Sequence, residues 1–538
     1  MSEYFINKKI NSKQKEFLHN VLDLGLDFLS GDLRKQKVLN YKDIEQLKEK
    51  YSYPIPQDSI DLKTLYTELL YLSQNSIAQS DHKYLAFPDS SGSLATYAAD
   101  IISSFLNQNL IAVDRSAPVS TFIEAQLITW LRHLIGFSDK TFDNTRTLSD
   151  LGGMWTTGGN MSNHIAILTA LITKFPQILK DGLCKLEKRP VIILSKGIAH
   201  YSFLSAAKVL GLGSEGILWT DTNDDFTTNI DSLQNTLKNL PSNVEPFMIV
   251  AVAGNCRTSS IDDILKISNV CKKNNIWFHV DACHGGSLLF SDKLRKQLNG
   301  IEQADSVTID PHKSLFVTYS SSYVLFKNPN VMNIYCRYQE QVNNTKIFDI
   351  GLITPFYGSR GFESLKLWLL IKHLGQKKIG EYVEQRNELY NIILNKIVET
   401  DLFVFFNSPK LYRSVFVFFP KSVRKYCEEN KIAQKTIVDL IEKYTIIFSD
   451  ILYKRGNVIL DLFKLNDFSD KLGFGKQKSY PVIGMSIGHV EMDSSEMNII
   501  LNEIIDVGNK VLSSMINELF NKERQVEKPD TLMGPDAW

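Results

Sequence analysis

Two residues able to do acid–base and covalent chemistry end two neighbouring apolar segments of the chain. Asp281 lies at the end of IWFHVDA (276–282), and Lys313, preceded by His312, ends DSVTIDPHK (305–313). Each apolar run predicts a buried strand, so the carboxylate and the amine are expected at adjacent strand ends. A lysine can form a Schiff base with an aldehyde, and a carboxylate can keep a pyridine nitrogen protonated so that the ring acts as an electron sink. The pair therefore predicts a site for pyridoxal 5'-phosphate (PLP).

Two further segments carry groups that the same cofactor needs. The segment LGGMWTTGGNMSNHIAIL places Gly159 and Asn160 in a turn directly before an expected helix. Exposed amides at such a turn and helix N-terminus form an anion site, suited to a phosphate. His200 follows an expected strand and precedes a helix of small residues, where a flat imidazole is able to stack on a pyridine ring. The turn alone is equally typical of a plain Gly-rich connection, and a lone histidine is more often an ordinary surface or core residue, so the prediction depends on their combination.

The surrounding pattern predicts three structural regions and a tail. Residues 1–110 show mainly helical periodicity, and residues 111–375 alternate helices with short apolar runs. Strands apolar on both faces and separated by helices are typical of a mainly parallel sheet covered on both sides, an α/β fold. Residues 376–515 predict a small α+β domain. The polar segment 516–538, with two prolines, predicts a loose tail.

The composition narrows the class of protein. Lys+Arg and Asp+Glu both number 60 among 538 residues, so the formal net charge is zero, which argues against a general binder of nucleic acid or anionic membranes. The start of the chain is polar and no apolar run reaches about 18 residues, so we expect neither a signal peptide nor a membrane span. The six cysteines show no C-x-x-C spacing and are expected as reduced thiols. We therefore expect a cytoplasmic protein.

Two motifs of other enzyme classes occur in unsuitable contexts. The G-x-G-x-x-G pattern at 211–216 follows an expected helix and precedes an expected strand, the reverse of a dinucleotide-binding turn. The G-x-S-x-G pattern at 484–488 is followed by one histidine, His489, only three positions after the serine, which does not suit a hydrolase triad. His279, Cys283 and His284 lack a fourth ligand at a workable spacing, so we expect no metal.

Seven motifs cover roughly residues 80 to 375: HKYLAFP, TTGGNMSN, FPQILKDG, AHYSFLSAAKVLGLG, KKNNIWFHVDACHGG, ADSVTIDPHK and SRGFESLKLWLLIKHLG. In these motifs and in their order the chain resembles the group II PLP-dependent decarboxylases, a family that includes glutamate, cysteine-sulfinate and aromatic amino-acid decarboxylases. The last third of the chain is only weakly similar.

The resemblance implies a fold type I PLP-dependent transferase-like subunit. It also implies a homodimer, formed with the help of the helical segment 1–110, that has its active site at the subunit interface. By motif, Lys313 would be the Schiff-base lysine, Asp281 would pair with the pyridine nitrogen, and His200 would stack on the ring. The remaining implied cofactor contacts are Gly159, Asn160, Cys283, Asp310 and His312.

Several positions depart from the family pattern near the reacting atoms. Asn255 and Cys256 replace a pair of threonines, and His284 stands where a Trp or Tyr is usual. The loop expected to carry a proton-donating tyrosine has Asn344 at the aligned position, although Tyr338 and Tyr357 lie nearby in the sequence.

The substrate-binding arginine of glutamate-type enzymes aligns with Gly484. Without that guanidinium a second carboxylate loses its bidentate partner, so glutamate is an unexpected substrate. Arg360, Arg337 or a basic residue of a second subunit could supply a substitute charge.

Three functions are compatible with these residues. The first is decarboxylation of an amino acid through Lys313. The second keeps the cofactor but leads to oxidative deamination to an aldehyde, or to other chemistry at Cα. The third is a non-catalytic homologue that acts as a binding partner, which the retention of both Lys313 and Asp281 disfavours.

Overall fold

A seven-stranded sheet forms the centre of the larger part of the molecule. The computed structural model describes residues 5–6, 9–87, 89, 91–137, 147–336 and 348–526. The strand order is β1-β7-β6-β5-β4-β2-β3. The strands are β1 (Gly153–Thr156), β2 (Arg189–Ser195), β3 (Ile217–Thr220), β4 (Val244–Val252), β5 (Trp277–Asp281), β6 (Ser306–Ile309) and β7 (Ser322–Phe326).

Only β7 runs against its neighbours in this sheet. It pairs antiparallel with both β1 and β6, whereas β6, β5, β4, β2 and β3 pair in parallel. This confirms the expected mainly parallel α/β fold. The buried Val, Ile, Leu and Phe side chains of β4, β5 and β6 explain why these runs are apolar on both faces.

Helices cover this sheet and connect its strands. The helix α6 (Gly159–Lys174) packs against β1 and β4 to β7, and α10 (Ile264–Asn274) packs against β4 and β5. Asp263 caps α10 by accepting from the Lys266 amide (3.1 Å). Other helices of this part are α5 (Pro118–Ile135), α7 (Ile178–Asp181), α8 (Tyr201–Val209), α9 (Ile230–Lys238), the 3-10 helix η5 (Gly285–Phe290) and α11 (Pro311–Ser314).

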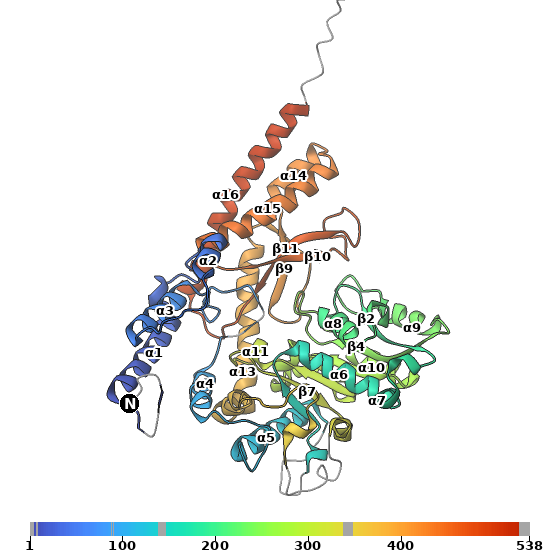
Figure 1. The fold of residues 1–538 in the computed structure, drawn as a ribbon. Helices are drawn as coiled ribbons and strands as arrows, with labels where there is room; N and C mark the ends of the chain where they lie inside the picture. Colours follow the sequence, from blue (N-terminus) through green and yellow to red (C-terminus); the bar gives the residue numbers. More distant parts are fainter. Residues whose placement is uncertain are drawn as a thin grey trace, which may run out of the picture.

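A smaller antiparallel sheet follows in the chain. Its order is β10-β11-β9-β8, and α15 packs on β9, β11 and α16 (Figure 1). Its elements are β8 (Phe403–Phe405), β9 (Arg413–Phe418), α14 (Lys421–Glu429), α15 (Gln434–Arg455), β10 (Asp461–Asn466), β11 (Ser479–Ser486) and α16 (Ser494–Val526).

The long helix α13 (Leu365–Val398) connects the two sheets. Gly375 interrupts its regular conformation with φ +69°. The helix nevertheless continues past residue 375, where we expected the large domain to end. At the other end, α16 continues past residue 516, where a tail was expected. Met515 and Leu519 are still buried, because the helical spacing of apolar residues continues there.

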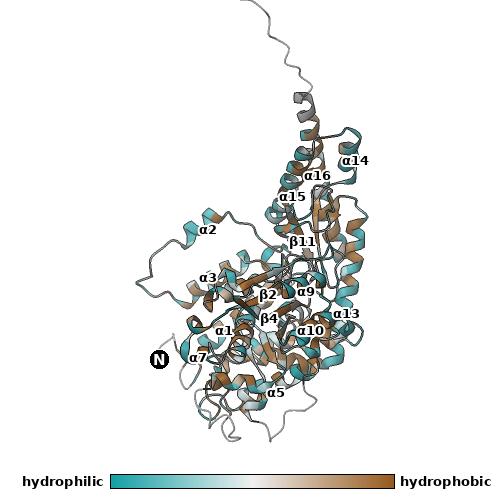
Figure 2. Cartoon of the chain, turned by 90° about the vertical axis from the view of Figure 1, so that its right-hand side faces the viewer, coloured by the Kyte–Doolittle hydropathy of each residue, from teal (hydrophilic) through white to brown (hydrophobic). Residues whose placement is uncertain are grey.

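Four helices precede the larger sheet: α1 (Ser12–Ser30), α2 (Ile44–Tyr51), α3 (Leu62–Asn75) and α4 (Leu94–Leu106). The α1 helix packs on α3, and α4 packs on α13. In Figure 2, α2 lies on an extended segment outside the main body, and none of its residues is buried. Within the described ranges, no helix is long and apolar enough to cross a membrane.

Candidate active site

The structure brings Asp281 and Lys313 to the same edge of the larger sheet. Asp281 is the last residue of β5 and lies opposite Thr308 of the parallel strand β6. Lys313 follows β6 in the short helix α11. The carboxyl ends of parallel strands meet at one edge, which explains why the two apolar runs predicted this neighbourhood.

Asp281 is held by a buried network of hydrogen bonds. Its Oδ2 accepts from Asn163 Nδ2 (3.1 Å), and its Oδ1 accepts from the Cys283 amide (3.2 Å) and the Thr308 hydroxyl (3.4 Å). Asn163 Oδ1 in turn accepts from His279 Nε2 (3.2 Å), so His279 Nδ1 accepts from the Ser306 hydroxyl (2.8 Å). Burial lowers the pKa of His279 to about 4, so this imidazole is neutral and its orientation is fixed.

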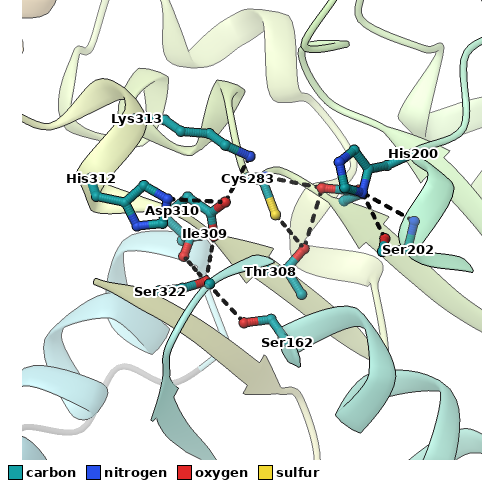
Figure 3. Close-up of polar contacts among 12 residues, drawn as sticks. Ser162, His200, Ser202, Cys283, Thr308, Ile309, Asp310, His312, Lys313 and Ser322 are labelled. Carbon is teal, nitrogen blue, oxygen red and sulfur yellow. Dashed lines mark hydrogen bonds and ion pairs between the residues drawn. The ribbon is translucent and has the colours of Figure 1, made fainter. Parts of the chain in front are cut away.

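Lys313 forms an ion pair with Asp310. Its Nζ lies 2.8 Å from Asp310 Oδ2, and the Ser322 hydroxyl donates to the other carboxylate oxygen. Burial disfavours the lysine charge, but the Asp310 carboxylate outweighs this and holds the pKa of Lys313 well above its ordinary value. His312 lies beside the pair, with Nε2 3.9 Å from Asp310 Oδ2 (Figure 3).

His200 lies across the site from this pair, with Cys283 between them (Figure 3). It precedes α8, and its Nδ1 lies 2.8 Å from the Ser202 hydroxyl. Burial, together with the charge of Lys313, lowers the pKa of His200, and Asp281 only partly opposes this. The imidazole is therefore neutral at ordinary pH, as a ring that stacks on an aromatic cofactor should be.

The predicted phosphate turn lies at the start of α6. Gly159 is the first residue of this helix, and no side chain caps it, so its first amides are free for an anion. A Cβ at Gly159 would lie 2.5 Å from Cys283 Sγ and 2.6 Å from Asp310 Oδ2. Asn160 is exposed, and its carbonyl oxygen lies 2.7 Å from His164 Nδ1.

These residues fit PLP. The sheet edge provides a lysine for the aldehyde and a fixed carboxylate for the pyridine nitrogen, and the α6 N-terminus provides amides for the phosphate. Cys283 is buried, and burial raises the pKa of its thiol well above the ordinary value, so a neutral sulfur faces the space left by Gly159.

A family model of the pyridoxal-dependent decarboxylase conserved domain matches residues 46–418. The chain belongs to this family. It is therefore a PLP-dependent carboxy-lyase, which sets aside the alternative of a non-catalytic homologue.

Two curated relatives of this family match most of the chain. The acidic amino acid decarboxylase GADL1 of Xenopus tropicalis is 26% identical over 430 residues, 78% of this chain and 80% of that protein. The glutamate decarboxylase of Drosophila melanogaster is 28% identical over 425 residues, 76% of this chain and 80% of that protein. The crystal structure of mouse CSAD has a TM-score of 0.81 at 21% identity and covers 93% of this chain and 99% of its own, which confirms the fold.

The residues that depart from the family pattern differ in their surroundings in the structure. Both ends of the Asn255 amide group are used for structural contacts. Its Oδ1 accepts from the Arg257 (2.8 Å) and Thr258 (3.1 Å) amides of its own loop, and its Nδ2 donates to the Ile198 carbonyl of a distant segment. Cys256 lines the cleft with Lys313. Three further positions considered from the sequence, Asn344, Tyr338 and Arg337, lie outside the described residues.

Two alternatives from the sequence are already used for other contacts. The Tyr357 hydroxyl lies 3.1 Å from both the amide and the hydroxyl of Thr157, in the phosphate turn. Arg360 donates through both terminal nitrogens to the buried carboxylate of Glu124. Neither side chain is therefore free in this structure to take the role considered for it.

Sequence reasoning missed Asn163, Thr308, Ser202 and Ser322. Asn163 lies four residues after Gly159, so both face the same side of α6, and this spacing was the available signal. Ser202 and Ser322 gave no signal, because their partners are distant in the chain: Asn163 Nδ2 donates to Ser202 (3.0 Å), and Ser322 contacts Asp310.

Proposed function

We propose that this protein removes the α-carboxylate of an amino acid other than glutamate. The observation that carries the proposal is the fixed Asp281 carboxylate at the strand end next to Lys313. Bound PLP supplies an electron sink for the electrons left on Cα when CO2 departs. The family membership supports decarboxylation, and the relatives, which are named decarboxylases of acidic amino acids and of glutamate, support an amino acid as the substrate.

The residues of the site have separate tasks in this reaction. Asp281, held from three sides, keeps a proton on the pyridine nitrogen. Asp310, 2.8 Å from Lys313 Nζ, is the nearest acceptor for the proton that the lysine must lose before it can attack an aldehyde. The neutral His200 orients the ring, and the first amides of α6 hold the phosphate.

The surroundings of Gly484 support a substrate other than glutamate. The Arg413 guanidinium lies over this glycine and pairs with Asp461 (2.5 Å). Its other N–H groups donate to the carbonyls of Ala86 (2.6 Å) and Arg257 (3.2 Å) and to the Ser486 hydroxyl. The arginine is saturated and its charge is compensated, so we expect a neutral, aromatic or otherwise atypical amino acid as the substrate.

An assay of CO2 and product with a panel of amino acids tests this proposal. We expect a neutral or aromatic amino acid to show a higher kcat/KM than glutamate, aspartate or cysteine sulfinate. A highest value for one of these acids would contradict the substrate class, while CO2 release from none of the panel would contradict the reaction.

Oxidative deamination to an aldehyde is the second candidate. It is favoured by the engagement of Tyr357 with Thr157, because a carbanion that is not promptly protonated can react with O2. Consumption of O2 with formation of aldehyde and H2O2 would identify this outcome, and a CO2-to-amine ratio of one would exclude it.

We also infer a homodimer. A groove of about 930 Å³ with apolar walls lies between α1 and α4 and reaches His312 and Tyr319, next to Lys313. Leu26 and Phe105 on its walls are 55% and 64% exposed, as expected of side chains that a second subunit covers. Light scattering should give twice the 61.2 kDa chain mass. Leu26→Glu with Phe105→Glu should give monomers, whereas Leu179→Glu, an exposed control outside the groove, should not.

We further propose a cytoplasmic location. Cys184, Cys256, Cys271 and Cys283 are free thiols, which is usual in a reducing compartment. Fractionation of the source cells would test this, and recovery in a secreted or organelle fraction would contradict it.

A further inference from the structure

One buried arginine outside the cofactor contacts has no carboxylate partner. Arg386 on α13 is fully buried, and its Nη2 donates to the Ser314 carbonyl oxygen (2.8 Å). Its Nε and Nη1 have no hydrogen-bond partner in the part of the chain that the structure describes, and no described carboxylate lies within ion-pair distance. Among the other buried arginines, Arg34 faces Asp81, Arg360 faces Glu124 and Arg413 faces Asp461, while Arg132 donates to the carbonyl oxygens of Gly152 and Phe326. Because a buried charge without a counter-charge is strongly disfavoured, Arg386 requires a compensating anion.

Other buried polar groups without partners adjoin this arginine. They are the Tyr412 hydroxyl, the Ser314 hydroxyl and both ring nitrogens of His284, none of which has a partner of good hydrogen-bond geometry among the described residues. The Arg386 guanidinium carbon lies 3.8 Å from the centre of the Tyr412 ring, and the His284 ring meets the same ring edge-on at 5.1 Å. The hydroxyls of Tyr412 and Ser314 are neighbours. We call Arg386, Tyr412, Ser314 and His284 the Arg386 cluster.

The local charge favours an acceptor rather than a donor. Burial, with the charges of Lys313, Arg386 and Arg413, lowers the pKa of His284 well below its ordinary value, so this residue contributes one neutral N–H donor. Asp310 and Asp461 are the acids paired with Lys313 and Arg413, which leaves the charge of Arg386 uncompensated. The charge of Arg386, which has no paired carboxylate, and the hydrogen-bond donors of these four side chains are the complement of a small anion.

We propose that the Arg386 cluster binds a small anionic group. A free ion such as chloride or the carboxylate of a ligand would provide the same chemistry. His284 also lines the cleft with Lys313, His200 and Asp281, so the bound group lies behind the cleft, between η5, α11 and α13. The proposal does not depend on the substrate class proposed above.

Chloride binding to the protein as purified tests the site directly. Replacing sodium gluconate with sodium chloride at constant ionic strength should broaden the ³⁵Cl NMR line and raise the Tm by about 2 °C at saturating chloride. Arg386→Met should lose both effects, and Arg386→Lys, which keeps the charge, should retain part of them. Arg455→Met, which removes a surface arginine paired with Asp506 and Glu503, should respond like the wild type.

Two outcomes would overturn the proposal. An unchanged line and Tm in the wild type would show that the cluster holds only water, and an equal response in Arg386→Met would show that chloride binds elsewhere. If Arg386→Met does not fold, His284→Phe replaces it, because the loss of one donor should weaken chloride binding about tenfold.

Competition distinguishes the two sources of the anion. If glutarate displaces chloride in the NMR titration, the cluster accepts carboxylates, which supports the anion site and contradicts the neutral substrate class. If neither glutarate nor glutamate changes chloride binding, the site takes a free ion. The anion site and the neutral substrate class are then both supported.

Discussion

The Arg413 guanidinium occupies the space that a side chain on Gly484 would fill. A Cβ at Gly484 would lie 3.0 Å from Arg413 Cζ and 2.8 Å from Phe463 Cε1. Arg413 projects from β9 and Gly484 lies on the adjacent strand β11, while Asp461, which compensates the charge, lies opposite Gly484 on β10. A larger side chain at position 484 would therefore meet the Arg413 guanidinium of the next strand, whose charge Asp461 compensates.

This packing predicts that Gly484→Ala lowers the free energy of unfolding by about 1–3 kcal/mol, the usual cost of overpacking. Denaturant unfolding measures it. Gly484→Arg alone should unfold more easily still and gain no glutamate decarboxylation. In combination with Arg413→Ser, which empties the space, the same arginine should be tolerated better. A Gly484→Arg single variant as stable as the wild type would contradict the prediction that Arg413 leaves no space for a side chain at position 484.

Lys313→Ala should abolish the covalent attachment of PLP. The wild-type protein should be yellow, and borohydride should fix the cofactor on the peptide that contains Lys313, as read by mass spectrometry. The variant should yield no modified peptide even where PLP still binds through its phosphate. A wild-type protein that stays colourless with added PLP would contradict the cofactor assignment.

Asp281→Asn preserves the size of the side chain but removes its charge. We expect kcat to fall by at least about 100-fold, the size of a single electrostatic contribution in an active site. Asp263→Asn, at the cap of α10, is the matched control and should leave kcat within twofold, roughly the effect of a remote surface change. Near-normal turnover in Asp281→Asn would show that this carboxylate does not sustain the electron sink.

His279 should make the fold sensitive to acid. Its pKa is about 4 in the folded protein against 6.5 for a free histidine. As the pH falls from 6.5 to 4, the unfolded chain takes up a proton that the folded chain does not, and stability falls. The expected loss is about 3 kcal/mol. Unfolding measured across this range should show a flatter profile for His279→Gln, and identical profiles would contradict the assignment.

The sequence predicts those parts of the site that depend on local pattern. Asp281 and Lys313 follow apolar runs, and Gly159 precedes a helix, so periodicity and turn chemistry were sufficient to place them. The antiparallel direction of β7 was not predictable, because the run at 322–327 looks like its parallel neighbours. The contact of Arg413 with Gly484 was equally hidden, since it joins residues far apart in the chain through the register of two strands.

The burial of Arg386 was likewise not predictable from local sequence pattern. A helical arginine in a polar stretch, YVEQRNELY, predicts a solvated face, yet the helix turns this side chain into the interior beside Tyr412. Burial of this kind is determined by tertiary packing between α13 and the segments at 284–314. No single segment of the sequence contains that information.

The close approach of Cys283 and Asp310 to Gly159 has a consequence for how this scaffold can evolve. A single added carbon at the start of α6 meets atoms on two other segments, so no one substitution there can be accommodated without simultaneous changes in β5–η5 and α11. At the small sheet, the Arg413 side chain from β9 fills the space beside Gly484 on β11. Diversification of activity on this scaffold is therefore expected to proceed by residue exchange at the small sheet, while the phosphate end of the cleft remains invariant.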